Sequence, residues 1–358
     1  MRSLAAGLLS AAVVFAVAPA CAQSIETIAG DGIAGRSGGK IDQPFGLAIG
    51  PDGKLYFCEV GNHRISRLDL KSHAIQTVAG TGQKGYAGDG GPAEDALMDE
   101  PYEIAFDPAG DLFFCDRTNH VVRRISRKTG FIETVAGTGK EGYAGDNGPA
   151  ASAQFRQPHS IAFAPDGHLL ICDILNFRIR SFDLRTGTIT TWAGTGARGN
   201  AEDGATITGT PLDGPRALAI DQAGNFYLAL REGNAIYRMD VKQGRMYRFA
   251  GTGEKGYSGD GGEARTAKLS GPKGVACGPD GSLYIADTEN HAIRRVDSKG
   301  VISTVAGTGE RGDGPDGDPL RSKLARPHGV FVDSAGVLYI SDTENHRVRI
   351  IRNGSYGR

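Results

Sequence analysis

The sequence predicts an all-β fold, a six-bladed β-propeller of four-stranded antiparallel blades that is closed by its N-terminal strand. One motif, Thr-Val-Ala-Gly-Thr-Gly or a close variant of it, occurs six times. A proline-led apolar run follows each copy, and these prolines are 57, 57, 57, 57 and 55 residues apart. Repeats of this length are typical of solenoids and propellers. The motifs begin at Thr27, Thr77, Thr134, Thr191, Arg248 and Thr304, and the prolines, which open blades 1 to 6, are Pro44, Pro101, Pro158, Pro215, Pro272 and Pro327.

Each repeat contains four short strand patterns, and the fifth repeat shows them most clearly. Residues 272–278 form a short apolar run, and a Pro-Asp-Gly turn separates it from the alternating segment 282–287. A Thr-Glu-Asn-His turn and a Ser-Lys-Gly turn then separate two further segments, 292–297 and 301–306. Four short strands without a helical period are typical of one propeller blade.

The two ends of the chain complement each other. After Pro327 the sequence has room for only three strands before it ends at Arg358. The segment 25–30, Ile-Glu-Thr-Ile-Ala-Gly, matches the fourth strand of the fifth repeat, 302–307. We therefore expect the N-terminal strand to complete blade 6 and remove the unpaired edge of an open array. Residues 23–358 are predicted to form this single propeller domain.

Residues 1–22 differ in composition from the rest of the chain. Arg2 precedes an uncharged apolar run, 4–17, and small residues lie before Gln23, as in a secretory signal peptide. The sequence thus predicts a secreted or periplasmic protein. A second interpretation is a lipoprotein attached at Cys21, although Ala18 stands where that motif prefers leucine.

Charge and cysteine spacing restrict the partners. The formal net charge is −1, which gives no bulk electrostatic reason to bind nucleic acid, and no segment after residue 22 is long and apolar enough to span a membrane. We expect a monomer. Beyond residue 22 there are four cysteines, three of them 57 residues apart in equivalent positions, too distant to form a disulfide. The three equivalent ones, Cys58, Cys115 and Cys172, are expected to be small buried residues with inert thiols, and the fourth is Cys277.

The pattern Pro-x-Gly-Val-Ala, Asp-Gly-x-Leu-Tyr-Ile-Ala-Asp, Asn-His-x-Ile-Arg-Arg-Val and Thr-Val-Ala-Gly-Thr-Gly resembles the NHL-repeat family. The resemblance covers residues 25–352. It implies a six-bladed propeller used as an interaction platform. Propellers related to this family include secreted lyases, such as the peptidyl-amidoglycolate lyase, and gluconolactonase-like enzymes with a channel metal, so the fold alone does not decide the function.

Residues shared by several copies are expected to support the blade. Asn-His pairs in the turn after the second strand are expected to stabilise that turn, with Asn234-Ala235 in their place in blade 4. Arginines in the third strand are expected to pair with acids between blades. The pairs begin at Asn62, Asn119, Asn290 and Asn345; the acids are Glu59, Asp116, Asp173, Asp287 and Asp342; the arginines are Arg64, Arg123, Arg178, Arg294 and Arg347.

The residue after each blade-opening proline varies, and it is expected near the mouth of the central channel. Blades 3 to 6 carry a basic or imidazole side chain there, and blades 1 and 2 carry aromatic ones. If they converge, an anion in the mouth would meet charge-assisted donors and ring faces; the alternative is that they splay over the rim. The residues are Phe45, Tyr102, His159, Arg216, Lys273 and His328, with Glu103 and Ser160 in the next position.

Blades 3 and 4 depart most from the repeat. Blade 3 has Phe177 in the histidine position, after Ile174 and Leu175, and blade 4 ends its second strand in Leu230-Arg231 instead of an acid. Phe177 and Arg231 are therefore candidates for a contact patch. Drift in a tolerant repeat is the alternative.

Two metal sites are conceivable from residue types. Asp313, Asp316 and Asp318 lie in a glycine-rich loop with ligands that suit Ca²⁺. His159 and His328 resemble the metal-binding histidines of the lyase relatives and could hold Zn²⁺ or Ca²⁺, but the charges of Arg216 and Lys273 oppose a cation. No nucleophile elbow, metalloprotease helix or phosphate loop is present.

These observations favour a non-catalytic propeller that binds a protein, an acidic small molecule or a glycan through the face that carries the channel mouth. The rival is a secreted metal-dependent lyase or lactone hydrolase in which His159 and His328 are catalytic. RNA binding, known among NHL proteins, is disfavoured by the predicted export and the charge balance.

Overall fold

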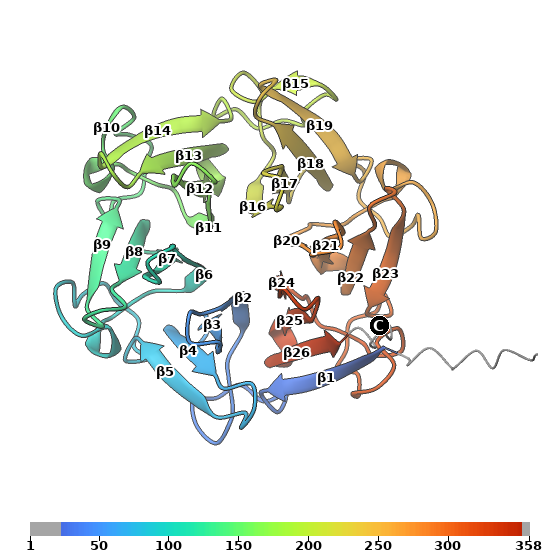
Figure 1. Cartoon of the computed structure of the whole chain (residues 1–358), viewed down its shortest axis with the longest axis horizontal. Coiled ribbons are helices and arrows are strands. Elements are labelled where there is room, and N and C mark those ends of the chain that lie inside the picture. Colours follow the sequence, from blue (N-terminus) through green and yellow to red (C-terminus); the bar gives the residue numbers. More distant parts are fainter. Residues whose placement is uncertain (1–22, 353–358) are drawn as a thin grey trace, which may run out of the picture.

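The computed structural model describes residues 23–352 and shows six sheets arranged around one axis (Figure 1). The predicted signal peptide, 1–22, and the final residues 353–358 lie outside the described residues. Blade 1 contains β2 (Pro44–Ile49), β3 (Leu55–Glu59), β4 (Arg64–Leu68) and β5 (Ile75–Ala79). Blade 2 contains β6 (Pro101–Phe106), β7 (Leu112–Asp116), β8 (Val121–Ile125) and β9 (Ile132–Ala136). Blade 3 contains β11 (Pro158–Phe163), β12 (Leu169–Asp173), β13 (Arg178–Asp183) and β14 (Thr188–Ala193), with the two-residue β10 (Gly148–Pro149) added outside.

The other three blades repeat the arrangement, so the predicted six-bladed, four-stranded architecture is confirmed. Blade 4 contains β16 (Pro215–Ile220), β17 (Phe226–Leu230), β18 (Ala235–Asp240) and β19 (Arg245–Ala250), with β15 (Ala205–Thr206) outside. Blade 5 contains β20 (Gly274–Cys277), β21 (Leu283–Asp287), β22 (Ala292–Val296) and β23 (Ile302–Ala306). Blade 6 contains β24 (Val330–Val332), β25 (Leu338–Asp342), β26 (Arg347–Arg352) and β1 (Ser24–Ala29).

The N-terminal strand closes the ring, as its sequence predicts. β1 pairs antiparallel with β26, with Ser24 opposite Arg352 and Ile25 opposite Ile351. Figure 1 shows the blue first strand as the outermost strand of the red last blade. Because Ile25 is fully buried in the core between blades 5 and 6, closure adds packing as well as hydrogen bonds.

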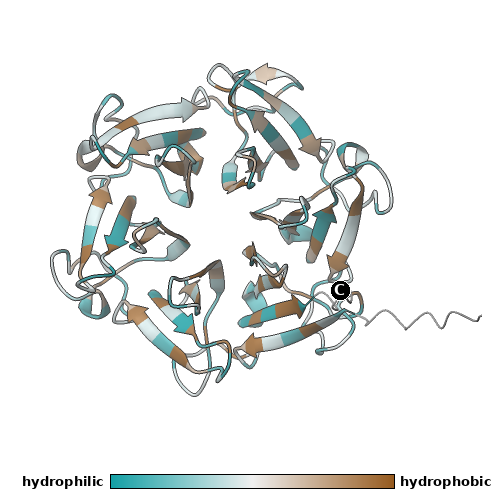
Figure 2. Cartoon of the chain, in the orientation of Figure 1, coloured by the Kyte–Doolittle hydropathy of each residue, from teal (hydrophilic) through white to brown (hydrophobic). Residues whose placement is uncertain are grey.

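The hydrophobic core consists of six clusters, each between two neighbouring blades. The cluster between blades 2 and 3, for example, contains Phe113 from β7 and Ile171 from β12. Hydrophobic residues recur along the strands of every blade in Figure 2. The three equivalent cysteines are free and fully buried, and burial raises their thiol pKa, which agrees with an inert role. The helices described within 23–352 are single turns, none of which could cross a bilayer.

The turn histidines that recur in four blades join neighbouring blades in addition to turning the chain. In the fourth position of each turn, His63, His120, His291 and His346 have left-handed backbones. Nδ1 of His120 accepts a hydrogen bond from the backbone N–H of Gln157, the residue before the next blade-opening proline, at 3.1 Å. The other three histidines make the same contact. In blade 4 this position belongs to Asn234, whose Oδ1 accepts from the Gly271 N–H at 2.9 Å, so the predicted alignment of Asn234-Ala235 is wrong by one residue.

The arginine prediction also needs correction. Arg123 pairs with Asp116 within its own blade and with Asp89 of the link that enters that blade, not with an acid of a neighbouring blade. In blades 3 and 6 the equivalent residues are Arg180 and Arg349, two positions beyond the predicted Arg178 and Arg347. The aspartates that pair with these arginines inside each blade are fully buried. For Asp116, burial raises the pKa to about 7, and the hydrogen bonds that its carboxylate accepts oppose this rise.

Candidate functional site

The local backbone of each inner strand directs one side chain towards the propeller axis. The residue before each opening proline has a positive φ, for example 58° at Glu100 and 45° at Arg326. In blades 1 to 4 the pairing with the second strand is then interrupted by a β-bulge, as between Pro215 and Ala217, where Arg216 is the extra residue. Bulges re-aim side chains. The residue after the proline is therefore turned into the channel.

The structure brings the six predicted side chains together. The ring of Phe45 lies 4.3 Å from that of Tyr102 and 4.2 Å from that of His328, and Tyr102 lies 4.6 Å from His159. Lys273 Nζ is 3.2 Å from His328 Nε2, and the Arg216 guanidinium is 4.6 Å from the Tyr102 ring centre. We call these six residues the channel ring. His159 and His328, from the opposite blades 3 and 6, lie at the two ends of a run of four rings.

Arg216 differs from every other deeply buried arginine. Its residue is 2% exposed, yet among residues 23–352 no carboxylate lies within 4.0 Å of its guanidinium and no hydrogen bond reaches it. By contrast, Arg123, Arg180, Arg294 and Arg349 are each paired with two aspartates. A buried cation is costly unless it has a partner. Arg216 therefore offers an unsatisfied positive charge in the middle of the channel.

Both histidines of the channel ring are held neutral. Nδ1 of His159 lies 2.6 Å from the Gln157 carbonyl oxygen, and Nδ1 of His328 lies 2.8 Å from that of Arg326. Because a carbonyl only accepts, Nδ1 carries the proton in each ring and Nε2 carries the lone pair. Burial, with Arg216 beside His159 and with Lys273 and Arg216 beside His328, holds both pKa values well below the usual range.

Lys273 is almost completely buried and paired on one side only. Its Nζ lies 2.9 Å from Glu289 Oε1, and the same carboxylate accepts from Arg326 at 2.6 Å. Burial lowers the Lys273 pKa to about 7, although Glu289 opposes the shift. The charge of Lys273 therefore changes within the physiological pH range.

Five of the six channel-ring residues line a cavity of about 420 Å³, which we call the mouth cavity. Arg216 is not among its lining residues; its guanidinium lies against the ring of Tyr102, which does line the cavity. All six blades contribute to its wall, which places it on the axis. Arg117, Arg198, Arg231, Lys273 and Arg326 contribute five basic side chains, whereas Glu100 and Glu232 are its only acids within 23–352. Burial, together with Arg216 and Arg231, lowers the pKa of Arg117 to about 10. The lining thus carries more basic than acidic side chains, but each of the five basic ones is paired with an acid, and three of these acids, Asp213, Glu289 and Glu344, lie outside the lining. Arg216 is the channel-ring cation that has no acidic partner within 23–352.

Arg117 and Arg326 were missed from the sequence. Arg117 donates to Gln157 Oε1 at 2.8 Å, pairs with Glu100 and lies over the Tyr102 ring. It occupies the same repeat position as Arg231, immediately after the second strand, so a full comparison of that position would have found it. Arg326 stands before the proline of blade 6, and only the fold shows that this position reaches the mouth.

Glu103 lies further along the channel. With Ser160 it lines a second cavity of about 310 Å³, whose other walls are the inner strands. A Cβ on Gly46 would lie 2.3 Å from Glu103 Oε1, so the glycine makes room for this carboxyl. Burial raises the Glu103 pKa to about 7, while Arg216 opposes the rise. Glu103 belongs to the channel but lies outside the mouth cavity.

The other two predicted binding residues, Phe177 and Arg231, line the mouth cavity, and Phe177 keeps the left-handed backbone of the histidine position with a φ of 52°. The carboxylates proposed for Ca²⁺ do not gather. Asp313 pairs with Arg347, Asp316 with Arg349 and Thr27, and Asp318 with Arg321. Within residues 23–352, no three His, Cys, Asp or Glu side chains are grouped so that they could hold a metal ion. The donor sets proposed for Ca²⁺ and Zn²⁺ therefore do not fit these positions.

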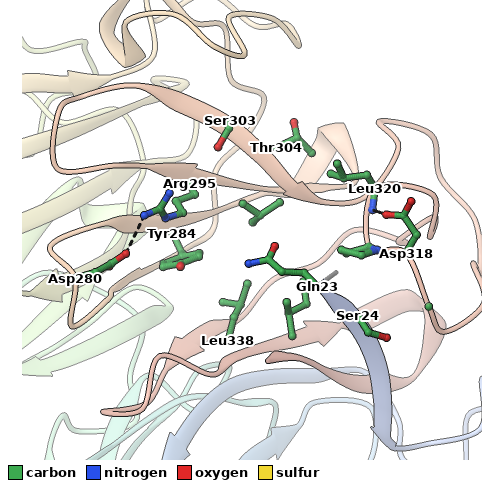
Figure 3. Close-up of a pocket in the computed structure, with 14 residues that line it drawn as sticks. Gln23, Ser24, Asp280, Tyr284, Arg295, Ser303, Thr304, Asp318, Leu320 and Leu338 are labelled. Carbon is green, nitrogen blue, oxygen red and sulfur yellow. Dashed lines mark hydrogen bonds and ion pairs between the residues drawn. The ribbon is translucent and has the colours of Figure 1, made fainter. Parts of the chain in front are cut away.

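A larger cavity, about 820 Å³, lies away from the channel, between blades 5 and 6 (Figure 3). Of its charged side chains, Arg295 donates to Asp280 at 2.8 Å, and Asp318 pairs with Arg321 outside the cavity. The equivalent cleft between blades 1 and 2 is lined by Tyr56 and Arg67 in the positions of Tyr284 and Arg295. This cleft follows from blade geometry, whereas the mouth cavity is lined by residues that differ between blades.

Comparison with known proteins supports the assignment of NHL repeats to this chain. The family model of the teneurin NHL domain matches residues 246–320, and that of the NHL repeat matches residues 324–351. Protein SUPPRESSOR OF QUENCHING 1, chloroplastic, of Arabidopsis thaliana is 29% identical over 279 residues, 74% of this chain and 26% of that protein. NHL repeat-containing protein 2 of Gallus gallus is 24% identical over 330 residues, 83% of this chain and 44% of that protein. The chain thus spans less than half the length of these relatives.

Solved structures show the same fold at low identity. An auxiliary nutrient binding protein from Bacteroides thetaiotaomicron superposes with a TM-score of 0.67 at 18% identity, over 93% of this chain and 77% of that chain. Virginiamycin B lyase from Staphylococcus aureus superposes with a TM-score of 0.52 at 17% identity, over 87% of this chain and 94% of that chain. At these identities the likeness concerns the fold alone.

Proposed function

Since the chain is a six-bladed propeller that carries NHL repeats, as its sequence pattern predicts, we propose that it is an exported binding protein whose mouth cavity takes a carboxylate-bearing ligand. The observation that carries this proposal is Arg216, a guanidinium that is 2% exposed and has no partner among residues 23–352. It lies against the ring of Tyr102, which lines the mouth cavity, so a carboxylate bound in the cavity would have to reach past that ring to meet it. A carboxylate would supply the two acceptors that a guanidinium fork prefers.

The surroundings of Arg216 support an anion. Lys273 adds a second cation, and Arg117 and Arg231 add guanidinium donors to the wall of the mouth cavity, each of them paired with a glutamate of the same wall. The two neutral imidazoles present acceptor lone pairs at Nε2 and so donate nothing to an anion; that of His328 accepts a hydrogen bond from Lys273 at 3.2 Å. Because Arg216 and Lys273 are buried, their charges act through a low effective dielectric and are worth more than on an open surface. A cavity of about 420 Å³ favours a small molecule or the end of a longer chain over a flat protein surface.

Titration calorimetry with sodium acetate and with an aromatic acid, 3-phenylpropionate, tests the proposal in a buffer that contains no carboxylate or phosphate. We expect saturable binding of a carboxylate to the wild-type protein and at least a tenfold loss in Arg216→Gln. The control is Arg185→Gln, because Arg185 is an exposed arginine of the β13–β14 turn. Equal affinity in Arg216→Gln and wild type would overturn the proposal. Export is tested separately, by cell fractionation with and without residues 1–22.

A further inference from the structure

The mouth cavity has two chemically different walls. Its basic side chains come from blades 2, 4, 5 and 6 and their links. Blade 3 instead contributes apolar side chains, Ile174 and Leu175 from η3 (Ile174–Asn176) and Phe177 directly after it. Val60 of blade 1 and the rings of Phe45 and Tyr102 extend this apolar side. The cavity is therefore amphipathic.

The apolar wall is specific to blade 3. In blades 5 and 6 the same turn reads Thr-Glu-Asn-His, as η5 (Thr288–Asn290) and η6 (Thr343–Asn345) with the following histidines. The hydroxyl of Thr288 donates to the Pro327 carbonyl at 2.7 Å, and Glu289 accepts from Lys273 and Arg326. Blade 3 replaces the threonine, the glutamate and the histidine with Ile174, Leu175 and Phe177. The hydrogen bonds and ion pairs that the polar residues make in the other blades therefore have no counterpart in blade 3.

These replacements are not explained by core packing alone. Ile174 is buried, but Leu175 and Phe177 remain partly exposed in the wall of the mouth cavity. Phe177 also keeps a left-handed backbone, which is unfavourable for a residue with a bulky side chain, without the interblade hydrogen bond that the histidines make there. Two partly exposed apolar side chains thus line the same cavity as Lys273, with the unpaired Arg216 behind the ring of Tyr102.

We propose that the ligand is an amphipathic monocarboxylate, in which an aromatic or bulky aliphatic group lies a few bonds from the carboxylate. This inference rests on the proposed function and adds the class of ligand. The carboxylate is directed to Arg216 and Lys273, and the apolar group lies against Leu175, Phe177 and the aromatic rings. Each buried methylene is worth about 0.8 kcal/mol, or roughly fourfold in affinity. A ligand with only a carboxylate leaves the blade 3 wall unused.

A ligand series on the wild-type protein tests this without depending on any variant. Acetate, hexanoate and 3-phenylpropionate are titrated at one pH, with 3-phenylpropionamide and inorganic phosphate for comparison. We expect 3-phenylpropionate to bind at least tenfold more tightly than acetate, with hexanoate between them, and the amide and phosphate to bind at least tenfold more weakly than 3-phenylpropionate.

Leu175→Ser and Phe177→His then remove the apolar wall, the second by restoring the residue that four blades carry. We expect the advantage of 3-phenylpropionate over acetate to fall at least threefold in each. Equal affinity of acetate and 3-phenylpropionate in the wild type would overturn this inference and leave the carboxylate site standing. Binding of the amide as tightly as the acid, or binding of neither acid, would overturn the carboxylate site itself. Circular dichroism confirms that the variants are folded.

Discussion

Nδ1 of His291 accepts a hydrogen bond from the backbone N–H of Arg326 at 3.1 Å, and Arg326 in turn holds Glu289 beside Lys273. The interblade contact of the repeat and the binding site are therefore physically connected between blades 5 and 6. The turn histidines keep their neighbours' opening residues in the left-handed conformation that brings the channel ring into place.

We predict that His291→Ala lowers the free energy of unfolding by about 1–3 kcal/mol, because it leaves the Arg326 N–H buried without its acceptor. His291→Asn should recover much of the loss, since Asn234 makes the same contact to Gly271 at 2.9 Å. Urea denaturation of the three proteins measures the difference. Equal stability of the Ala and Asn variants would show that the histidine acts by packing alone.

The repeat explains why so much of this fold can be predicted from the sequence. Six copies of one unit give the number of blades, and the match between 25–30 and 302–307 identifies the closing strand. The channel ring was found because comparison of the copies separates positions that support the blade from a position that varies. A residue that differs from its equivalents in the other five repeats can therefore be recognised without an alignment of related proteins.

What could not be predicted depends on contacts between segments that the repeat does not align. Arg178 and Arg180 are two residues apart on one strand, so their side chains share a face and the spacing does not tell which pairs with Asp173. The unpaired state of Arg216 is a second example, because it depends on where every acid near the axis lies. The bulge that aims this side chain leaves no mark in the hydrophobic pattern.

Replacing a buried arginine with methionine should change the free energy of unfolding in opposite directions, depending on whether that arginine is unpaired, like Arg216, or paired, like Arg294. In a buffer free of carboxylate and phosphate, we predict that Arg216→Met raises the free energy of unfolding by about 1–2 kcal/mol, since it removes a buried charge without a partner. Arg294→Met should lower it by about 3–5 kcal/mol, because Asp287 would then be buried without its cation. Thermal and urea denaturation provide both values. A loss of stability in Arg216→Met as large as in Arg294→Met would mean that Arg216 has a structural partner.

The last prediction concerns pH, and two groups of the channel determine its sign. Burial lowers the pKa of Lys273 to about 7, so this lysine loses its charge as the pH rises from 6 to 8. Burial also raises the pKa of Glu103 to about 7, so this carboxyl gains a negative charge over the same range. Both changes weaken the attraction for an anion. We therefore predict that the affinity for 3-phenylpropionate falls by about tenfold between pH 6 and pH 8, the order of one pKa unit of interaction.

Two variants assign this fall in affinity to its sources. Glu103→Gln keeps the shape of the side chain and should remove only the part due to the carboxyl, while Lys273→Met should bind weakly already at pH 6 and keep only the part of the fall that is due to Glu103. His159 and His328 do not contribute, since their pKa values lie well below this range. Calorimetry at pH 6, 7 and 8 on the three proteins gives the profile. A wild-type affinity that is constant, or that rises with pH, would contradict the assignment of these two groups to the binding site, because neither could then act on the bound anion.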